Sequence, residues 1–253
     1  MKFSIIIPTK NRAVLLNRAL KSVLAQTNQN YELIVVDDGD GSGLELANHL
    51  KSPKIVTLSS AQAGQVAARE MAIDHAKGQH LAWLDDDDWW EPWHLAGLDK
   101  ILARGTCVAF SSGWIGHETE AGVHISTSPF QASASLASLH ENNTLLWSGL
   151  AYPKEFHQVL GKFDESLAYY WDWDWYLRVA NAGIQFNTTQ RASVWISART
   201  SSVSSAQNEV QRRIELDRLQ SKHNLGIIEL KNHASIADEQ AATMPLDLES
   251  LRA

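Results

Sequence analysis

The sequence predicts an α/β fold with a mostly parallel, Rossmann-like central sheet that is flanked by helices. Three observations support this prediction. Short apolar runs alternate with segments of helical periodicity as far as about residue 110, the runs are rich in β-branched residues, and polar clusters directly follow several of them. The chain has 253 residues, of which 44% are hydrophobic and 20% are charged, so it can bury the core of one large domain.

The elements can be assigned in chain order from length and periodicity. We expect strands over residues 3–7, 33–36, 55–58, 80–84 and 107–110, and helices over residues 12–26, 62–77 and 93–104. Residues 111–150 are less regular. A further helix is predicted from about Asp172 to near Gly183, and an amphipathic helix over residues 205–222. Its apolar face would carry Val210, Ile214 and Leu219. The last 20 or so residues have weak periodicity, which predicts a flexible or partner-docked tail.

Composition excludes some classes of function. The formal net charge is −7, so no overall positive field exists to attract nucleic acid. Cys107 is the single cysteine, so an internal disulfide is impossible and a reducing compartment is favoured. No stretch approaches the ~20 apolar residues that span a bilayer. We therefore expect a cytoplasmic protein without a transmembrane segment, and peripheral attachment to the inner face of the membrane stays open.

Three polar loops follow three of the predicted strands. They are Pro8-Thr9-Lys10-Asn11, Asp37-Asp38 and Asp85-Asp86-Asp87-Asp88. In open parallel sheets the ligand binds at the carboxyl ends of the strands, so these loops should meet along one edge.

The aspartate run is the most unusual of these loops. Adjacent carboxylates repel one another, and a bound cation removes that penalty. Oxygen ligands of this type suit Mg²⁺ or Mn²⁺, which also bridge to substrate phosphates. The alternative is a solvated acidic loop before the predicted helix at residue 93, whose positive end favours carboxylates. The position of the run, directly after a strand at the binding edge, favours the metal site.

Several segments, in this order, resemble the family 2 glycosyltransferases, which are inverting enzymes with the GT-A fold. The resemblance covers roughly residues 3–200 and is carried by Ser4-Ile5-Ile6-Ile7-Pro8-Thr9-Lys10-Asn11-Arg12, Glu32-Leu33-Ile34-Val35-Val36-Asp37-Asp38-Gly39, Ala76-Lys77-Gly78, Leu84-Asp85-Asp86-Asp87-Asp88, Phe163-Asp164-Glu165-Ser166-Leu167 and Asp172-Trp173-Asp174-Trp175-Tyr176-Leu177-Arg178. Each motif alone is loose, but the ordered set is specific.

The resemblance implies a division of the chain. Residues 1–112 would form the nucleotide-sugar-binding half, and residues 113–204 the acceptor-binding and catalytic half of the same domain. Residues 205–253 would be a C-terminal helical extension or tail. The implied donor is a nucleotide sugar, with a UDP-sugar favoured, and the implied acceptor is a saccharide or a lipid-linked molecule in surface polysaccharide or glycolipid assembly. The sequence does not indicate an oligomeric state.

The resemblance also implies roles on the donor side. Pro8, Thr9, Lys10 and Asn11 would line the base and ribose, and Asp38 would bind the base. Gly64 and Arg69 would approach the nucleotide. Asp85, Asp86 and Asp87 would form the DxD-type site, with Asp87 as the direct ligand of Mn²⁺ or Mg²⁺ and Asp86 as a candidate for the ribose.

On the acceptor side, Asp172 aligns with the general base of the family. From spacing alone, an aspartate at a helix start is most often an N-cap. Asp174 is the reserve candidate for the base or an acceptor contact, although it can instead pair with Arg178 four residues later. Trp171 and Trp147 are expected to face the acceptor, whereas helical spacing predicts that Trp173 belongs to the core.

Three departures from the family pattern concern catalysis. Trp171 stands where an acidic residue usually precedes the base, and Glu70 stands where an Asn often follows the helix arginine. Arg199 lies near the place of a family histidine, where it could neutralise the leaving diphosphate. The departure at Trp171 leaves a second hypothesis open, a non-catalytic sugar-nucleotide-binding domain. A nucleotidyltransferase is a third, but the loop after Ile7 lacks the glycines that it normally has.

Overall fold

The structure of the protein is a computed structural model that describes residues 1–119, 122–199 and 208–243. Residues 200–207 and 244–253 lie outside the described residues. The first part of the helix predicted over residues 205–222 and about half of the predicted tail therefore fall there.

A seven-stranded sheet forms the centre of the molecule, in the order β10-β6-β9-β4-β1-β2-β3. Its strands are β1 (Phe3–Thr9), β2 (Tyr31–Asp37), β3 (Ile55–Ser59), β4 (His80–Trp83), β6 (Val108–Phe110), β9 (Leu150–Pro153) and β10 (Phe186–Thr188). Neighbouring strands run parallel except at β9, which is antiparallel to both β4 and β6. The predicted α/β class with a mostly parallel sheet is confirmed.

A smaller second sheet has the order β5-β11-β7-β8. Its strands are β5 (Trp89–Trp90), β7 (Gly113–Glu118), β8 (His124–Phe130) and β11 (Val194–Ala198). β5 follows the aspartate run and pairs with β11, whereas β9 and β10 from the second half of the chain complete the central sheet. The two predicted halves therefore share both sheets.

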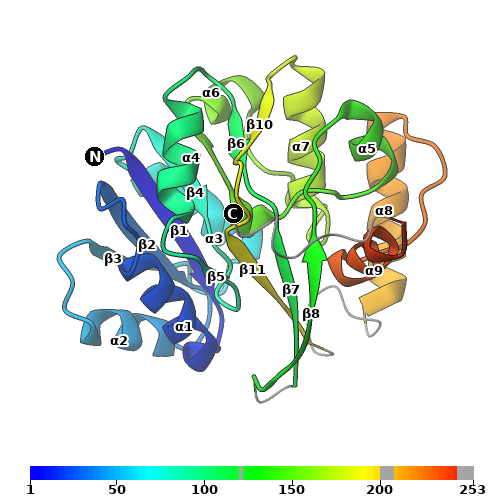
Figure 1. Ribbon diagram of the computed structural model, residues 1–253. Coiled ribbons are helices and arrows are strands. Elements are labelled where there is room, and N and C mark those ends of the chain that lie inside the picture. Colours follow the sequence, from blue (N-terminus) through cyan, green and yellow to red (C-terminus); the bar gives the residue numbers. More distant parts are fainter. Residues whose placement is uncertain (120–121, 200–207, 244–253) are drawn as a thin grey trace.

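Helices flank the central sheet. They are α1 (Ala13–Leu24), α2 (Ser42–His49), α3 (Gln65–His75), α4 (His94–Leu102), α5 (Leu136–Glu141), α6 (Phe156–Leu160), α7 (Trp171–Asn181), α8 (Glu209–His223) and α9 (His233–Thr243), with a 3-10 turn η1 (Trp147–Gly149). Figure 1 shows α8 and α9 gathered at the opposite side of the molecule from β3.

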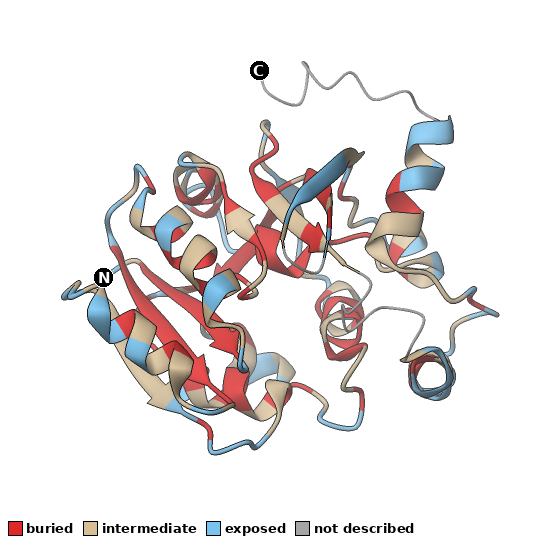
Figure 2. Ribbon diagram, turned by 90° about the horizontal axis from the view of Figure 1, so that it is seen from below, coloured by how far each residue is buried: buried red, intermediate tan, exposed pale blue. Residues whose placement is uncertain are grey.

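The core lies between the central sheet and these helices. Every residue of β1 and β2 is buried, and the two strands run through the interior while the helices turn exposed faces outward (Figure 2). This burial on both faces explains why the strands consist of continuous apolar runs rather than alternating patterns.

The sequence prediction missed or misplaced several elements. The residues of α2 contain Gly43 and Glu45 and show little apolar periodicity, yet the helix forms because the carboxylate of Asp37 accepts hydrogen bonds from the amides of Gly39 and Gly43 at 2.7 and 2.9 Å. The irregular stretch 111–150 contains β7, β8 and α5, which pair with or pack against distant segments. The existence of these elements depends on long-range contacts rather than on a local pattern.

The C-terminal helices also correct the sequence prediction. In α8, Leu219 is buried as expected, but Val210 and Ile214 are 77% and 43% exposed. The buried face instead carries Arg212 and Glu215, because their polar ends meet the backbone of Lys231 and Tyr169. Residues 233–243 are helix α9, which packs against β8, so these residues form a helical extension, one of the two predicted alternatives, rather than a flexible tail. No helix within the described residues is both long and apolar enough to cross a membrane.

Candidate active site

A cavity of about 1100 Å³ opens at the carboxyl ends of β1, β2 and β4. It extends from there past the start of α7 to the second sheet, α8 and α9. Ligand pockets usually measure ~300–1,000 Å³, so the cavity has room for a donor and part of an acceptor. Its walls include most of the residues that the sequence singled out: Pro8, Thr9, Lys10, Asp38, Gly64, Arg69, Asp85, Asp86, Asp87, Trp147, Trp171 and Asp172.

The loop after β1 contributes Pro8, Thr9 and Lys10 to the cavity wall, but Asn11 has a different place. Asn11 adopts a left-handed backbone conformation, with φ of 55°. Its side-chain oxygen accepts a hydrogen bond of 2.8 Å from the amide of Asp40. Asn11 therefore holds the first polar loop against the second, while its neighbours face the cavity.

Asp38 is buried at the end of β2 and is held by three donors. Its carboxylate accepts hydrogen bonds from the Ser60 hydroxyl at 2.6 Å, the Gly64 amide at 3.0 Å and the Lys10 ammonium at 3.1 Å. Burial alone would raise the pKa of Asp38, but these hydrogen bonds outweigh it and lower the pKa. Gly64, with φ of 99°, lets the chain turn so that its amide reaches the carboxylate. The carboxylate is therefore ionised and fixed in orientation at neutral pH.

Alternate members of the aspartate run face the cavity. Asp85 and Asp87 keep 33% and 19% of their side chains exposed, whereas that of Asp86 is fully buried. Asp86 is closed off by the Thr9 hydroxyl, which donates to one oxygen at 2.6 Å, and by Arg12 at the other. The accessible carboxylates thus have the spacing of a DxD pair, Asp85 and Asp87, and the structure places Asp86 behind them rather than at a surface that a ribose could contact.

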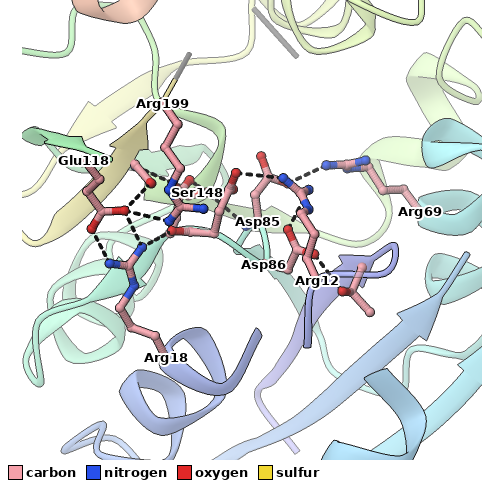
Figure 3. A network of polar contacts seen from close by, with 12 residues as sticks. Arg12, Arg18, Arg69, Asp85, Asp86, Glu118, Ser148 and Arg199 are labelled. Carbon is pink, nitrogen blue, oxygen red and sulfur yellow. Dashed lines mark hydrogen bonds and ion pairs between the residues drawn. The ribbon is translucent and has the colours of Figure 1, made fainter. Parts of the chain in front are cut away.

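Arginines neutralise the run. Arg12 forms ion pairs of 2.6 Å with Asp86 and 2.9 Å with Asp87, and Arg69 pairs with Asp85 (Figure 3). The sequence prediction assigned this neutralisation to a metal alone. Within the described residues, no group of three or more His, Cys, Asp or Glu side chains is already gathered around a metal position.

The exposed pair nevertheless fits a divalent cation. Mg²⁺ in particular is usually bound by one or two carboxylates together with substrate phosphates and waters, rather than by a complete cage of protein ligands. Asp85 and Asp87 supply two partly exposed carboxylates on one cavity wall.

Asp88 ends the run and anchors it to the second half of the chain. It accepts hydrogen bonds from the Ser148 hydroxyl and, at 2.9 Å, from the Ser197 amide. Helix α4 begins only at His94, so Asp88 lies outside the first turn of that helix. Its role is to fix the run between η1 and β11.

Glu118 organises a further set of arginines at this side of the cavity (Figure 3). It accepts from Ser197 and Arg199 at 2.6 Å each and from Arg18, which also donates to the carbonyl oxygen of Asp87 at 2.6 Å. Burial would raise the pKa of Glu118, but the hydrogen bonds from Arg18, Ser197 and Arg199 lower it to about 2. Arg199 therefore lies on the cavity wall as a positioned cation.

Asp172 lies on the cavity wall at the start of α7, and its carboxylate is half-buried. The helix begins at Trp171, with Tyr170 at the N-cap position and no side-chain cap, so Asp172 does not cap it as spacing alone suggested. Asn143 donates a hydrogen bond of 2.9 Å to Asp172. Burial raises the pKa of Asp172 to about 6, although the hydrogen bond from Asn143 opposes the rise. A carboxylate with such a pKa can accept a proton near neutral pH.

Trp171, at the start of α7, and Trp147, in η1, contact each other on the cavity wall. Both line it but are 5% exposed, and they meet edge to face with centroids 4.5 Å apart. The Arg69 guanidinium lies 4.4 Å above the Trp171 ring while also pairing with Asp85. Trp171 thus supports the arginine that holds the aspartate run. Trp173 is buried, as predicted, and its indole donates to the Leu139 carbonyl at 2.7 Å.

Asp174 lies apart from the cavity. Its carboxylate is fully buried and pairs with Arg178 at 2.9 Å, Lys222 at 2.7 Å and His223 at 2.7 Å. The predicted pairing with Arg178 is confirmed. The reserve candidate for the base does not line the cavity. Glu70, the other departure from the family pattern, accepts from the Phe163 amide at 2.9 Å and so fastens α3 to the segment before α7.

The residues with direct contacts to the site that were not singled out from the sequence include Arg12, Arg18, Glu118 and Asn143. Arg12 had a signal, because it directly follows the first polar loop. Arg18 looked like a solvent-facing residue of a helix, and Glu118 and Asn143 lie in the irregular stretch. Their partners are between 29 and 100 positions away in the chain, which no local pattern reveals.

Paired carboxylates on the wall of a cavity at the carboxyl ends of parallel strands, with Asp172 at the start of α7 in the same cavity, form the arrangement expected of a glycosyltransferase of the GT-A class. The chain belongs to glycosyl transferase family 2, whose sequence pattern matches residues 4–156. The resemblance predicted from the sequence motifs is thereby confirmed, and the family supports transferase activity.

Known proteins of similar sequence are also glycosyltransferases. The chain is 31% identical over 242 residues to the uncharacterized glycosyltransferase YwdF of Bacillus subtilis. The aligned region covers 94% of this chain and 90% of YwdF. It is 40% identical over 97 residues to the putative colanic acid biosynthesis glycosyl transferase WcaA of Escherichia coli, which covers 37% of this chain and 35% of WcaA.

Solved structures of S. aureus TarS share the fold. TarS residues 1–349 in complex with UDP-GlcNAc match with a TM-score of 0.63 and 18% sequence identity, over 98% of this chain and 77% of the TarS chain. The complex with UDP matches with a TM-score of 0.61. At this level of identity the likeness establishes the GT-A fold alone.

Proposed function

We propose that the protein transfers a sugar from a UDP-sugar to a hydroxyl group of a saccharide or glycolipid acceptor, with inversion at the anomeric carbon and with the help of Mg²⁺ or Mn²⁺. The observation that carries this proposal is the placement of Asp172 in the same cavity as the exposed carboxylates of Asp85 and Asp87. A basic carboxylate across from a nucleotide-diphosphate site is what direct displacement by an activated hydroxyl requires.

The donor end is supported by the first two loops and by the arginines. Asp38 is held as an oriented anion that can accept hydrogen bonds from a nucleobase, and Pro8, Thr9 and Lys10 lie beside it. The likeness to a fold that is known with UDP and UDP-GlcNAc favours a uridine nucleotide. Arg12, Arg69 and Arg199 surround the part of the cavity where a diphosphate would lie, and guanidinium groups bind phosphate oxygens in a bidentate manner.

The reaction is a single displacement. Asp172 accepts the proton of the acceptor hydroxyl, whose oxygen attacks the anomeric carbon on the face opposite the diphosphate. The bond between that carbon and the diphosphate oxygen breaks, and UDP leaves with the electron pair. Asn143 keeps the Asp172 carboxylate oriented toward the acceptor throughout.

Asp87, together with Asp85, would hold the divalent cation. When bound, the cation neutralises the charge that develops on the diphosphate. Arg199, which is held in place by its ion pair with Glu118, would stabilise the same negative charge on the diphosphate.

The acceptor class rests on relatives and on composition. A relative named for colanic acid biosynthesis and a chain with one buried cysteine favour surface polysaccharide or glycolipid assembly in the cytoplasm, at the inner face of the membrane. Neither the oligomeric state nor the sugar enters this proposal.

The test compares the wild type with Asp172→Asn. UDP release from a panel of UDP-hexoses is measured with Mn²⁺ and a membrane lipid extract as the source of acceptors, and UDP binding is measured by calorimetry. We expect transfer to fall by about 10²–10⁴-fold, because the amide cannot accept the proton, while UDP affinity stays within about two-fold.

Asp217→Asn, an exposed aspartate on α8, is the matched control and should retain full transfer. If Asp172→Asn keeps wild-type transfer, Asp172 is not the base. A thermal-shift panel of UDP, GDP, dTDP and CMP, each with and without Mn²⁺, tests the donor side, because a ligand that binds the native state raises the melting temperature. The absence of any stabilisation would contradict the donor site.

A further inference from the structure

The Arg12 guanidinium occupies the cation position of the aspartate run. Its two terminal nitrogens reach two different carboxylates, Asp86 at 2.6 Å and Asp87 at 2.9 Å. Figure 3 shows its side chain extended toward the run from the loop after β1. Asp87 is one of the two carboxylates that remain accessible to a metal. The guanidinium and a divalent cation therefore compete for the same ligand.

The competition is unequal for the two aspartates. Asp86 is fully buried and already accepts a hydrogen bond from Thr9, so it is anchored whether or not Arg12 is present. Asp87 is partly exposed, and Arg12 itself is 39% exposed, which leaves the guanidinium room to move into the cavity. The contact that can be given up at least cost is the one between Arg12 and Asp87.

A bound diphosphate would change the balance. Arg12 lines the cavity together with Arg69 and Arg199, and of these three Arg69 is held by Asp85 and Trp171 and Arg199 by Glu118. A nucleoside diphosphate brings several phosphate oxygens, which are strong bidentate partners for a guanidinium. When Arg12 turns to these oxygens, Asp87 loses its counter-ion and becomes a ligand for the metal.

We propose that Arg12 couples the two ligands: it blocks Asp87 against a divalent cation until a nucleoside diphosphate draws the guanidinium away. This inference rests on the proposed function, because it assumes the donor and the metal assigned there. It predicts that the free protein binds Mn²⁺ weakly, and that UDP and Mn²⁺ strengthen each other's binding. Thermodynamic linkage requires the strengthening to be equal in both directions.

The test measures Mn²⁺ binding to the full chain by electron paramagnetic resonance of the free ion, with and without UDP. We expect UDP to tighten Mn²⁺ binding to the wild type by about ten-fold or more. Arg12→Ala removes the competitor, so Mn²⁺ binding without UDP should tighten by about ten-fold. In this variant, UDP should strengthen Mn²⁺ binding only through the metal ligands that its phosphates add.

Lys21→Ala is the matched control, because it removes one positive charge from an exposed position of α1, the helix that follows the same loop. It should leave Mn²⁺ binding in the absence of UDP within about two-fold of the wild type, because interactions between exposed charges are screened by salt. If Arg12→Ala and Lys21→Ala tighten Mn²⁺ binding equally, general charge explains the effect and the inference is wrong.

Arg12→Lys keeps the charge but cannot bridge two carboxylates in the same way, so it should give an intermediate Mn²⁺ affinity and serves if the alanine variant does not fold. A wild type that binds Mn²⁺ with UDP, but whose affinity for Mn²⁺ alone is the same as that of Arg12→Ala, overturns the coupling and leaves the proposed function intact. A wild type that never binds Mn²⁺ contradicts both.

Discussion

The proposed donor side and the proposed acceptor side of the cavity are stabilised by different interactions. On the donor side, three short loops at the ends of β1, β2 and β4 carry carboxylates that are matched by arginines and lysine over short distances. On the acceptor side, α7 presents Asp172 from a cluster of packed aromatic rings, and buried ion pairs join it to α8. The donor side is thus electrostatic and partly exposed, whereas the acceptor side depends on burial.

This difference predicts where each side is vulnerable. A charge removed from the donor side should change ligand binding more than folding. A charge removed from the buried ion pairs between α7 and α8 should change folding more than catalysis, because its buried partner would be left without a counter-ion.

The largest expected effect is on stability, for Asp174→Ala. The substitution leaves Arg178, Lys222 and His223 without their shared carboxylate, and Lys222 retains only Asp164 at 2.7 Å. We expect the free energy of unfolding to fall by about 3–5 kcal/mol. Urea denaturation with intrinsic tryptophan fluorescence measures it.

Asp217→Ala is the control, because Asp217 forms an exposed i,i+4 pair with Arg213 on the same helix. It should change the free energy of unfolding by less than about 0.5 kcal/mol. Equal effects of the two substitutions would show that the burial of the ion pairs between α7 and α8 does not contribute to stability. The proposed difference between the two sides of the cavity would then be wrong.

The second prediction concerns Arg69, the residue that joins the two sides. It pairs with Asp85 and lies 4.4 Å above Trp171, so its loss should disturb both the aspartate run and the start of α7. We expect Arg69→Ala to lower kcat/KM by about 100-fold, with KM for the donor rising and kcat falling.

Steady-state kinetics of UDP release measures both constants. Arg191→Ala provides the control, since Arg191 lies 3.6 Å over the ring of Trp93 but outside the cavity. It should keep kcat/KM within about two-fold of the wild type. A change in KM alone in Arg69→Ala would mean that the donor side can be altered without any effect on catalysis.

The same contrast explains what the sequence could predict. The sequence signals are local for β1, β2, β4 and the loops after them. In each case a buried apolar run ends in polar residues, and both features lie within ten positions of each other. The positions of Pro8, Asp38 and Asp85 on the cavity wall followed from that pattern. The metal and the exact roles of these residues stay predictions.

The acceptor side could be predicted only in part. Family position indicated Asp172, and helical spacing indicated the Asp174 pair and the burial of Trp173. Asn143, Glu118 and the buried face of α8 could not be predicted, because their partners are distant in the chain and become neighbours only through tertiary packing. The burial that makes the acceptor side stable is the reason that its residues carry no local signal.

The smallest expected effect tests how finely the acceptor side tunes its base. Asp172 must be ionised to accept a proton, and burial raises its pKa to about 6. The value of kcat/KM should therefore decrease as the pH falls through about 6, rather than near 4 as for an ordinary aspartate. The hydrogen bond from Asn143 opposes the rise in pKa, so Asn143→Ala should raise the pKa of Asp172 further. We expect the acidic limb of the pH profile to move upward by about one to two pH units, because a hydrogen bond to a charged group contributes roughly 1.5–3 kcal/mol.

Asn142→Ala is the neighbouring control for that measurement, because Asn142 also lines the cavity while the hydrogen bond to Asp172 comes from Asn143. Its pH profile should coincide with that of the wild type. A profile of Asn143→Ala that loses amplitude without moving along the pH axis would mean that Asn143 acts on the acceptor and not on Asp172. A limb near pH 4 in the wild type would mean that the group titrating in catalysis is solvated, and then the acceptor side would be no less exposed than the donor side.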